Sequence, residues 1–272
     1  MSISKFIWWF GGDATDPNIA LGDTFLTSNA KTRAYWNFTT QLSGNEGDAT
    51  GNVSDLRGNG WTLSNFSGAA FPIIGKMQEG LREVNVLNAY TPSTYEYGLV
   101  GTGASTNLLK NSVEVHLLIN IFDGRPSSTT YLFGVANGGT QTFRIGLNTS
   151  GNLTLDYAAA GAGGSNLISS GNALPNGLTG VCLIRLICDF GTDVISGMVN
   201  GVPVSFTLNS GNAISTWNPA NWVCSKGIGI GGHWDSAFTN DADNVKHVLK
   251  TSVTDLLTDD EYLILAASFL NY

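Results

Sequence analysis

Oxygen-bearing side chains gather in the segment HWDSAFTNDADN, which spans residues 233–244. Within it, Asp235, Asp241, Asp243 and Asn244 offer carboxylate and amide oxygens. Hard oxygen ligands of this kind suit calcium, so these four residues are our candidate metal ligands, and no other cofactor is expected. Their spacing matches no EF-hand. The alternative is a solvated acidic loop in which the Asp and Asn side chains form turns.

Three tryptophans lie in loop-like sequence near this segment, namely Trp217, Trp222 and Trp234. Sugar-binding sites place exposed aromatic faces beside amide and carboxylate groups, and Asn221 stands next to Trp222. We therefore take these four residues as a candidate glycan site. Large aromatic residues also cap the open ends of β-sandwiches, with an apolar body and one polar handle. This second interpretation stays open.

Phe6, Trp8, Trp9 and Phe10 belong to the run FIWWF near the N-terminus. If it were exposed, this run would form an apolar patch that soluble monomers rarely carry. It is expected either to form an edge strand or to dock into a neighbouring subunit, and in the second case these residues are assembly contacts. Only Lys5 precedes the run as a basic residue, and no small-residue cleavage site follows it, so secretion through a signal peptide is not expected.

Composition narrows the class of protein. The chain has 272 residues, 34 glycines and only 12% charged residues, about half the usual share of roughly 25%. Many short strands joined by tight turns have this composition. The net charge is −8 without a Lys/Arg cluster, which argues against a nucleic-acid partner. No apolar run approaches the roughly 20 residues that cross a bilayer, so no membrane partner is expected.

Alternation of apolar and polar residues predicts several strands. Residues 113–121 alternate in a way that predicts one buried face. Residues 143–147 and 153–157 alternate likewise around a Gly-containing turn, which predicts a hairpin. Residues 181–190 are apolar on both faces, as a central strand would be.

Two local signals mark where elements turn or begin. Asn200 and Gly201 separate two apolar runs, and both residue types tolerate the positive φ angles of a tight hairpin. Thr258 and Glu261 are spaced as a capping box. An apolar helical pattern follows, which predicts one short C-terminal helix.

The three cysteines are expected to be reduced. Cys182 and Cys188 lie six residues apart on one predicted strand, and at about 3.3 Å per residue they are roughly 20 Å apart. A disulfide needs Cα atoms within about 7 Å, so these two cannot pair. Cys224 could reach one of them, but three thiols without a framework are typical of buried, reduced residues.

The order of several segments resembles a known family. AYWNF at residues 34–38 precedes the turn Asp55-x-x-Gly58-Asn59-Gly60, and VISGMVNG at 194–201 follows the central strand. KGIGIGG at 226–232 and VKHVLKTSV at 245–253 complete the set. This order is similar to that of laminin-G-like, concanavalin A-like jelly rolls, and the match covers about residues 34–270.

The resemblance implies an all-β fold, a two-sheet antiparallel jelly-roll sandwich with a short C-terminal helix. Residues 31–272 would form this domain. Residues 1–30 are less patterned and are expected to form an N-terminal arm, a candidate docking segment. Some laminin-G-like domains bind calcium in rim loops, which agrees with the candidate ligands in residues 235–244.

The same resemblance bears on catalysis. Laminarinase-type glucanases share the fold and hold acid and nucleophile on one strand in a Glu-x-Asp-x-(x)-Glu motif, at the separation that a retaining mechanism needs. The segments around Glu83 and Glu114 each lack the second carboxylate. We therefore expect no enzymatic activity, and a divergent glycosidase that depends on Glu83 or Glu114 is one alternative.

Composition and resemblance together favour a non-enzymatic structural or binding protein of a bacteriophage virion. It would be a capsid decoration, a fibre or a tail-associated protein, made in the host cytoplasm and located in the virion. Its partners would be other virion subunits, further copies in a homo-oligomer, and glycans contacted by an outward lectin-like domain. A free carbohydrate-binding module is the other alternative.

Overall fold

The computed structural model describes most of the chain. The described residues are 22–64, 73–79, 82–88, 99–102, 108–121, 126, 129–137, 141–158, 164–169, 180–217, 228–231, 233–234, 238–239 and 245–270.

Strands dominate these residues and form two layers. Sheet A has the strand order β13 (Val194–Val199), β12 (Gly180–Asp189), β7 (Val113–Ile121), β18 (Val245–Thr254), β5 (Arg82–Asn88) and β4 (Ile73–Glu79), and β1 (Thr32–Asn37) also pairs with β18. Sheet B has the order β2 (Val53–Ser54), β3 (Thr62–Ser64), β6 (Leu99–Thr102), β15 (Ile228–Ile230), β8 (Thr130–Asn137), β9 (Gln141–Leu147), β10 (Leu153–Ala158) and β11 (Ser165–Ser169). Neighbouring strands are antiparallel throughout.

One strand belongs to both layers. Strand β14 (Val202–Ser210) pairs with β13 of sheet A on one side and with β11 of sheet B on the other. The two sheets are therefore parts of one curled antiparallel sheet, and a small separate ladder joins β16 (His233–Trp234) to β17 (Phe238–Thr239). The expected all-β sandwich is confirmed.

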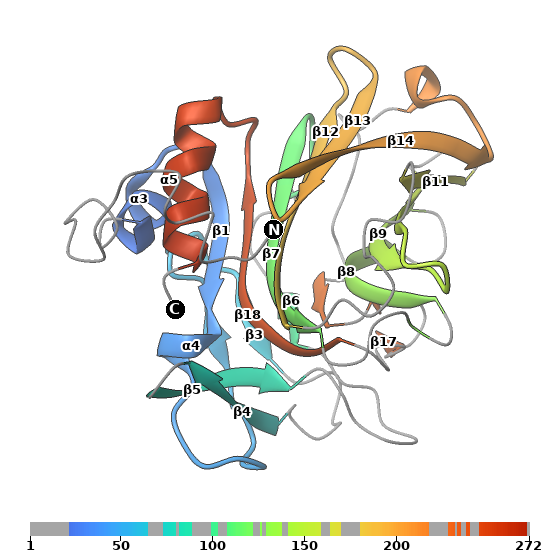
Figure 1. Ribbon diagram of the computed structural model, residues 1–272. Coiled ribbons are helices and arrows are strands. Elements are labelled where there is room, and N and C mark those ends of the chain that lie inside the picture. Colours follow the sequence, from blue (N-terminus) through green and yellow to red (C-terminus); the bar gives the residue numbers. More distant parts are fainter. Residues whose placement is uncertain are drawn as a thin grey trace.

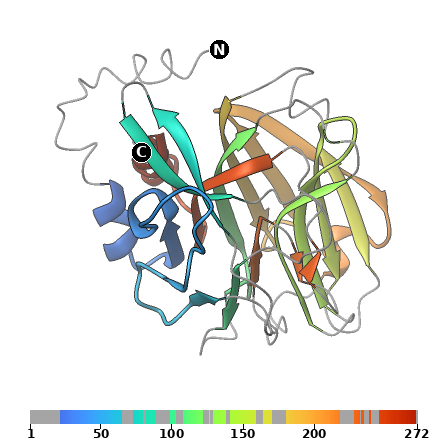
Figure 2. The same cartoon turned by 90° about the horizontal axis from the view of Figure 1, so that it is seen from below.

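Two helices, α3 (Gly22–Ser28) and α5 (Asp259–Leu270), cover the outer face of sheet A. The structure also describes α4 (Phe38–Gln41) and the 3-10 turn η1 (Ile214–Thr216). Figure 1 shows α3 and α5 on one side of sheet A and strands β8, β9 and β11 of sheet B on the other. The view turned by 90° in Figure 2 shows the same order of layers.

Alternation along the central strands fills two separate hydrophobic clusters. On β7, Leu117 and Ile119 join the cluster between the sheets, whereas Leu118 joins the cluster beneath α3 and α5. On β12, Ile184 and Leu183 divide in the same way. Sheet A is therefore a middle layer with an apolar contact on each face.

The expectation of a single buried face on β7 is wrong. All residues of this strand are buried, including Glu114 and His116. Alternation shows only that the polar residues share a face, and here α5 covers that face with Tyr262 and Phe269, which pack against His116.

The hairpin at Asn200 and Gly201 is confirmed. Val199 pairs with Val202, and the two turn residues have φ angles of 51° and 76°. Positive φ at both central positions is what a type I′ turn requires. Local sequence chemistry therefore predicts this turn, and Asn200 also holds it to β12, because its N–H donates to the Leu183 carbonyl at 2.9 Å and its Oδ1 accepts from the Leu183 N–H at 2.8 Å.

The capping box is also confirmed. The Thr258 N–H donates to Glu261 Oε2 at 2.8 Å, and the Glu261 N–H donates to Thr258 Oγ1 at 3.3 Å. These two bonds satisfy backbone donors that a helix start leaves open, and α5 begins at Asp259.

The described end of the expected N-terminal arm is anchored to sheet A. Helix α3 contributes the fully buried Leu26 to the cluster beneath α5. Asp23 accepts a hydrogen bond from the Tyr35 hydroxyl and another from Asn37 Nδ2 at 2.9 Å. Residues 22–28 thus pack as part of the domain.

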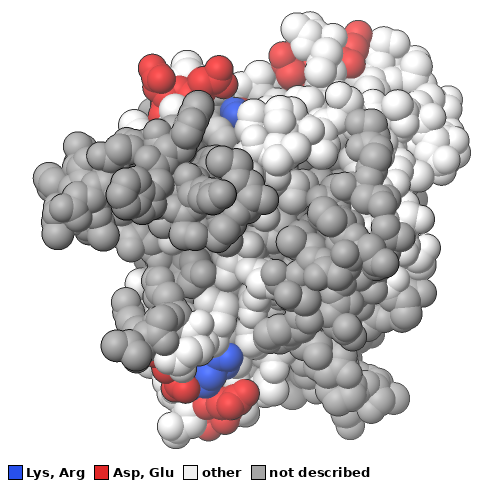
Figure 3. Space-filling model, viewed as in Figure 1, with Lys and Arg blue, Asp and Glu red and all other residues white. Residues whose placement is uncertain are grey.

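Cys182 and Cys188 are free and fully buried, as expected. Both side chains belong to the cluster between the sheets. Among the described residues on the face shown in Figure 3, acidic groups lie near the periphery.

Candidate functional site

A row of polar side chains crosses the outer face of sheet B. On β9 and β10, Phe143, Ile145 and Tyr157 point into the core between the sheets. Because successive side chains of a strand point to opposite faces, Arg144 and Asp156 point outward. The strand register places these two residues directly opposite each other.

Asp156 lies at the centre of this row. Its Oδ1 accepts a hydrogen bond from Asn166 Nδ2 at 2.6 Å, and its Oδ2 accepts one from the Tyr131 hydroxyl at 3.1 Å. Arg144 Nη2 lies 3.2 Å from Oδ2, and Asn166 Oδ1 accepts from Asn209 Nδ2 at 3.0 Å. We call these five residues the polar row; they come from the adjacent strands β8, β9, β10, β11 and β14.

Arg144 has a second support besides the carboxylate. Its Cζ atom lies 4.8 Å from the centroid of the Tyr131 ring, a cation–π contact. Gly146 leaves room for that ring, because a Cβ atom there would lie 3.1 Å from Tyr131 Cδ1 and 2.5 Å from the Thr130 carbonyl oxygen. The guanidinium is thus held by an acid on one side and an aromatic ring on the other.

A cavity of about 200 Å³ opens beside the polar row. Arg144, Asp156 and Asn166 line it, together with Gly164 and Ser210. The side chains of Arg144 and Asp156 are 24% and 19% exposed, so solvent reaches both charges. A small cavity with fixed polar groups suits a polar ligand.

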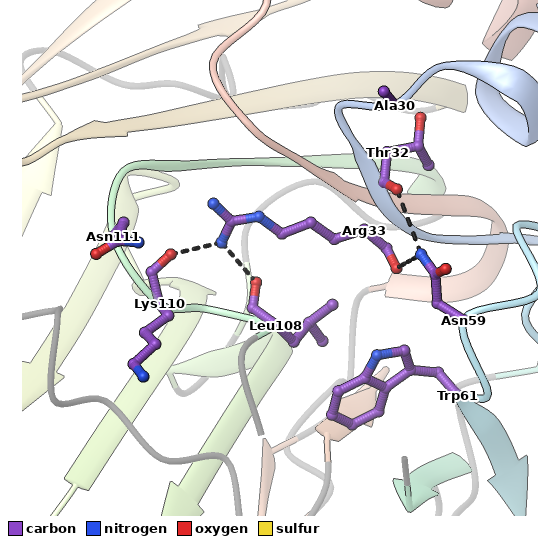
Figure 4. A pocket seen from close by; sticks show the side chains of 8 residues that line it. All are labelled: Ala30, Thr32, Arg33, Asn59, Trp61, Leu108, Lys110 and Asn111. Atoms are coloured by element: carbon purple, nitrogen blue, oxygen red, sulfur yellow. Dashed lines mark hydrogen bonds between the residues drawn. The ribbon is translucent and has the colours of Figure 1, made fainter. Parts of the chain in front are cut away.

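A second cavity, of about 430 Å³, lies near the start of β1 and is drawn in Figure 4. Arg33 spans it from β1, with Asn59 and Trp61 on one side and Lys110 and Asn111 on the other. Two sets of hydrogen bonds shape this cavity, one made by the Asp55 carboxylate and one made by the Arg33 guanidinium.

The Asp55 turn is held by the Asp55 carboxylate. Oδ1 accepts from the Tyr35 and Arg57 N–H groups at 2.8 Å each, and Oδ2 accepts from the Asn59 N–H at 2.9 Å. Burial raises the pKa of Asp55, although these hydrogen bonds act in the opposite direction. The turn also uses a positive φ of 81° at Gly58. The sequence Asp55-x-x-Gly58-Asn59 is therefore explained by the hydrogen bonds and the backbone conformation of this turn.

Arg33 ties the walls of this second cavity together. Its Nη1 donates to the carbonyl oxygens of Leu108 at 3.0 Å and Lys110 at 2.7 Å, as Figure 4 shows. Its Nη2 donates to the Ser112 carbonyl at 2.9 Å, and its Nε donates to Asp255 Oδ1 at 2.8 Å. Because this guanidinium stabilises the fold, we take the polar row as the candidate binding site.

Trp217 of the predicted glycan site is almost fully buried. It is 7% exposed, and its ring stacks on Tyr157 with centroids 4.1 Å apart and planes 6° apart. Phe190 packs against both rings, and Trp217 Nε1 donates to the Asn212 carbonyl at 3.3 Å. This environment favours the alternative role of an aromatic cap on the sandwich.

The other predicted site residues lie outside what the structure describes. Trp234 belongs to β16, but its side chain is not described. The remaining residues all fall outside the described ranges: Trp222, Asn221, Asp235, Asp241, Asp243, Asn244, Phe6, Trp8, Trp9 and Phe10. Their expected roles in glycan binding, metal binding and assembly stay predictions.

Glu114, one of the two glutamates considered for catalysis, is buried in an ion pair. Its Oε2 lies 2.8 Å from Arg185 Nε and 3.0 Å from His116 Nε2, and its Oε1 accepts from the Leu257 N–H at 2.9 Å. Burial alone raises the pKa of Glu114, but the hydrogen bonds from His116 and Arg185 outweigh it and lower the pKa to about 2. A carboxyl group with this pKa holds no proton for a general acid to donate near neutral pH.

Glu83, the other glutamate, lies in a different setting. Its side chain is 58% exposed on β5 and forms an ion pair with Lys76 at 3.4 Å. Strand β18 separates β5 from β7, which carries Glu114.

Within the described ranges, no group of three or more His, Cys, Asp or Glu side chains is placed to hold a metal ion. Among the same residues, no helix is long and apolar enough to span a bilayer.

Comparison with known protein families and with curated proteins finds no match. Solved structures do show similar folds. The binding domain of botulinum neurotoxin DC in complex with SialylT has a TM-score of 0.52 and 10% identity, covering 91% of this chain and 53% of that chain. Trypanosoma rangeli sialidase in complex with 2,3-difluorosialic acid has a TM-score of 0.53 and 14% identity, covering 93% of this chain and 38% of that chain.

A carbohydrate-binding module, CBM40 of the Ruminococcus gnavus IT-sialidase bound to α2,6-sialyllactose, has a TM-score of 0.45 and 16% identity. It covers 61% of this chain and 87% of that chain. The fold likeness rests on the neurotoxin domain and the T. rangeli sialidase, and at their identities it is a likeness of fold alone. This chain thus shares a β-sandwich fold with these domains.

Proposed function

We propose that this protein is a non-catalytic carbohydrate-binding module and that the polar row on sheet B is its binding surface. The observation that carries the proposal is the row itself. Five polar side chains on five adjacent strands are joined by three hydrogen bonds and one ion pair beside a cavity of about 200 Å³.

Sugars suit such a surface for physical reasons. A sugar presents hydroxyl groups in fixed directions, so a site with polar groups already in place loses little entropy on binding. The row is preorganised because Asp156 fixes Tyr131, Arg144 and Asn166 at once. A sheet also holds side chains more rigidly than a loop does.

The fold likeness agrees with a sugar ligand. The neurotoxin binding domain and the T. rangeli sialidase, both with TM-scores above 0.5, are complexes with SialylT and with 2,3-difluorosialic acid. Fold by itself does not determine function. The likeness therefore supports only the class of ligand, and the location of the site is argued from the polar row.

The state of Glu114 supports a role without catalysis. A retaining glycosidase of the laminarinase type needs a carboxylic acid with a raised pKa opposite a second carboxylate. Glu114 is 1% exposed, lies against Arg185 and has a pKa lowered to about 2. Its surroundings are those of a structural ion pair.

Isothermal titration calorimetry with a broad set of soluble oligosaccharides tests the proposal. Tyr131→Ala and Asn166→Ala should each weaken binding at least about tenfold, since each removes a member of a coupled network. Lys76→Ala on β4 is a control outside the row and should bind as the unaltered protein does. Thermal unfolding checks that every variant is folded.

Two outcomes would count against the polar row. If the protein binds none of the sugars in the set, the proposed function is refuted. Binding that survives Tyr131→Ala and Asn166→Ala but is lost in Trp222→Ala or Trp234→Ala would move the site to the tryptophans predicted from the sequence. Loss of binding with a calcium chelator would likewise point to the predicted ligands between Asp235 and Asn244.

A role in a phage virion remains a proposal from composition and resemblance, and no described contact favours it over a free module. Imaging of particles that lack the protein tests it. Loss of a surface feature would support a virion role, and unchanged particles would rule out a decoration protein.

A further inference from the structure

We infer that the polar row binds a sugar that carries a carboxylate, with Arg144 as the residue that contacts this group. The inference rests on the proposed function and names its ligand class. Asp156 and Tyr131 then act as positioning residues, because they hold Arg144 in place.

The first step concerns the orientation of Arg144. Its guanidinium lies 3.2 Å from Asp156 Oδ2 and its Cζ atom lies 4.8 Å from the Tyr131 ring centroid. The side chain is 24% exposed and lines the cavity beside the row. A guanidinium fixed in this way keeps its planar fork in a defined direction before a ligand arrives.

The second step concerns the acceptors of the row. Asp156 Oδ1 already accepts from Asn166, and Oδ2 accepts from Tyr131 beside Arg144. Asn166 Oδ1 already accepts from Asn209. Because each of these oxygens already accepts a bond within the row, a ligand that brings acceptors for the Arg144 guanidinium fits better than one that brings only donors.

The third step concerns charge. Among the described residues that line the cavity, Arg144 is the only Lys or Arg and Asp156 is the only Asp or Glu, and the two form an ion pair at 3.2 Å. A carboxylate offers two acceptor oxygens at the spacing that a guanidinium matches, and such charge-assisted bonds are stronger than bonds between neutral groups. The chain carries a net charge of −8, so attraction of an acid must come from this local contact and not from the overall field.

Matched pairs of ligands test the inference directly. Methyl glucuronide and methyl glucoside differ only in a carboxylate against a hydroxymethyl group, and 3′-sialyllactose and lactose differ by one acidic sugar. Calorimetry or NMR titration should show at least one acidic member binding about tenfold or more tightly than its neutral partner. Which pair shows the difference identifies a uronic or a sialic acid as the source of the carboxylate.

Variants then assign the preference to Arg144. Arg144→Gln should bring the ratio of acidic to neutral affinity to about one, and Arg144→Lys should give an intermediate ratio, because lysine keeps the charge without the planar fork. Lys76→Gln removes one positive charge from β4 and should leave the ratio unchanged. Arg144→Lys keeps the test decisive if Arg144→Gln is poorly folded.

Three results would overturn the inference. Equal affinity for both members of each pair would refute an acidic ligand while leaving carbohydrate binding in place. A ratio that persists in folded Arg144→Gln would refute the role of Arg144. Failure to bind every sugar in a broad set, neutral ones included, would instead refute the proposed function itself.

Discussion

Arg185 and Glu114 form a two-point ion pair beneath helix α5. Arg185 Nε lies 2.8 Å from Glu114 Oε2, and Nη2 lies 2.8 Å from Oε1, with both side chains at most 3% exposed. The Arg185 guanidinium also lies 4.0 Å from the centroid of the Tyr262 ring. This pair therefore joins strands β7 and β12 of sheet A to the helix that covers them.

Glu114→Gln should destabilise the protein by about 3 kcal/mol or more, because it leaves the buried Arg185 charge without a counterion. Urea unfolding followed by tryptophan fluorescence measures the change. Glu83→Gln is the control, since Glu83 is 58% exposed, and its effect should stay within about 0.5 kcal/mol. Adding Arg185→Met to Glu114→Gln should recover part of the loss, and a double variant less stable than both single variants would contradict this account.

Stability should fall as the pH falls below about 6.5. Burial lowers the pKa of His116 in the folded protein, although Glu114 acts in the opposite direction. The unfolded chain therefore takes up a proton near pH 6.5 that the folded state resists, and the free energy of unfolding decreases until the lower folded pKa is reached. Urea midpoints between pH 8 and 5 measure this loss, and His116→Asn should reduce the slope. A midpoint independent of pH in this range would contradict the prediction.

A second loss of stability is expected in stronger acid. The pKa of Glu114 is about 2 in the folded protein against an ordinary 4.5. The unfolded carboxylate takes up a proton as the pH falls through about 4.5, while the folded one stays ionised. Stability should therefore decline between about pH 4.5 and 2, and Glu114→Gln should lose this component.

Gly146→Ala should destabilise the fold by about 1–3 kcal/mol, the usual effect of forcing extra atoms into a packed site. The added methyl group would lie 2.5 Å from the Thr130 carbonyl oxygen, and this backbone atom has no rotamer with which to escape. Gly164→Ala is the matched control, since its Cβ would meet no atom within 4 Å. Equal unfolding midpoints for the two variants would contradict so close an approach of Thr130 to Gly146.

Cys182 and Cys188 should resist thiol reagents in the folded protein. Burial raises the pKa of Cys182 to about 12 and also raises the pKa of Cys188. The thiolate is the reactive form, and neither side chain is exposed. In a Cys224→Ser variant, labelling at pH 8 should appear only after denaturation. Rapid labelling of two thiols under native conditions would show that the core opens readily.

Local chemistry explains which parts of the fold could be predicted from the sequence. The turn at Asn200 and Gly201 and the capping box of Thr258 and Glu261 depend on residues within a few positions of each other, and the structure has both. Apolar runs likewise identify central strands such as β12. Each of these features is determined by residues that lie close together in the sequence.

The second face of β7 could not be predicted in this way. Glu114 and His116 have the alternation of a solvent-exposed face, and only the packing of α5 buries them. No local pattern tells whether a distant helix will cover a strand. The aromatic stack of Trp217 on Tyr157 has the same cause, since the two rings are 60 residues apart in the chain.

The polar row was partly encoded in the sequence. Once the hairpin between residues 143 and 157 is predicted, its register brings Arg144 opposite Asp156, and this pairing was the available signal. Asn166 and Asn209 come from strands whose pairing spans 43 residues. Their place in the row depends on the pairing of β11 with β14, and no short turn connects these two strands.

The dual membership of strand β14 has a mechanical consequence. The backbone of β14 is hydrogen-bonded to β13 of sheet A on one edge and to β11 of sheet B on the other. A force applied to one sheet is therefore transmitted to the other through backbone hydrogen bonds as well as through side-chain packing. Separating the two layers along this border therefore requires the ladder between β14 and either β13 or β11 to break.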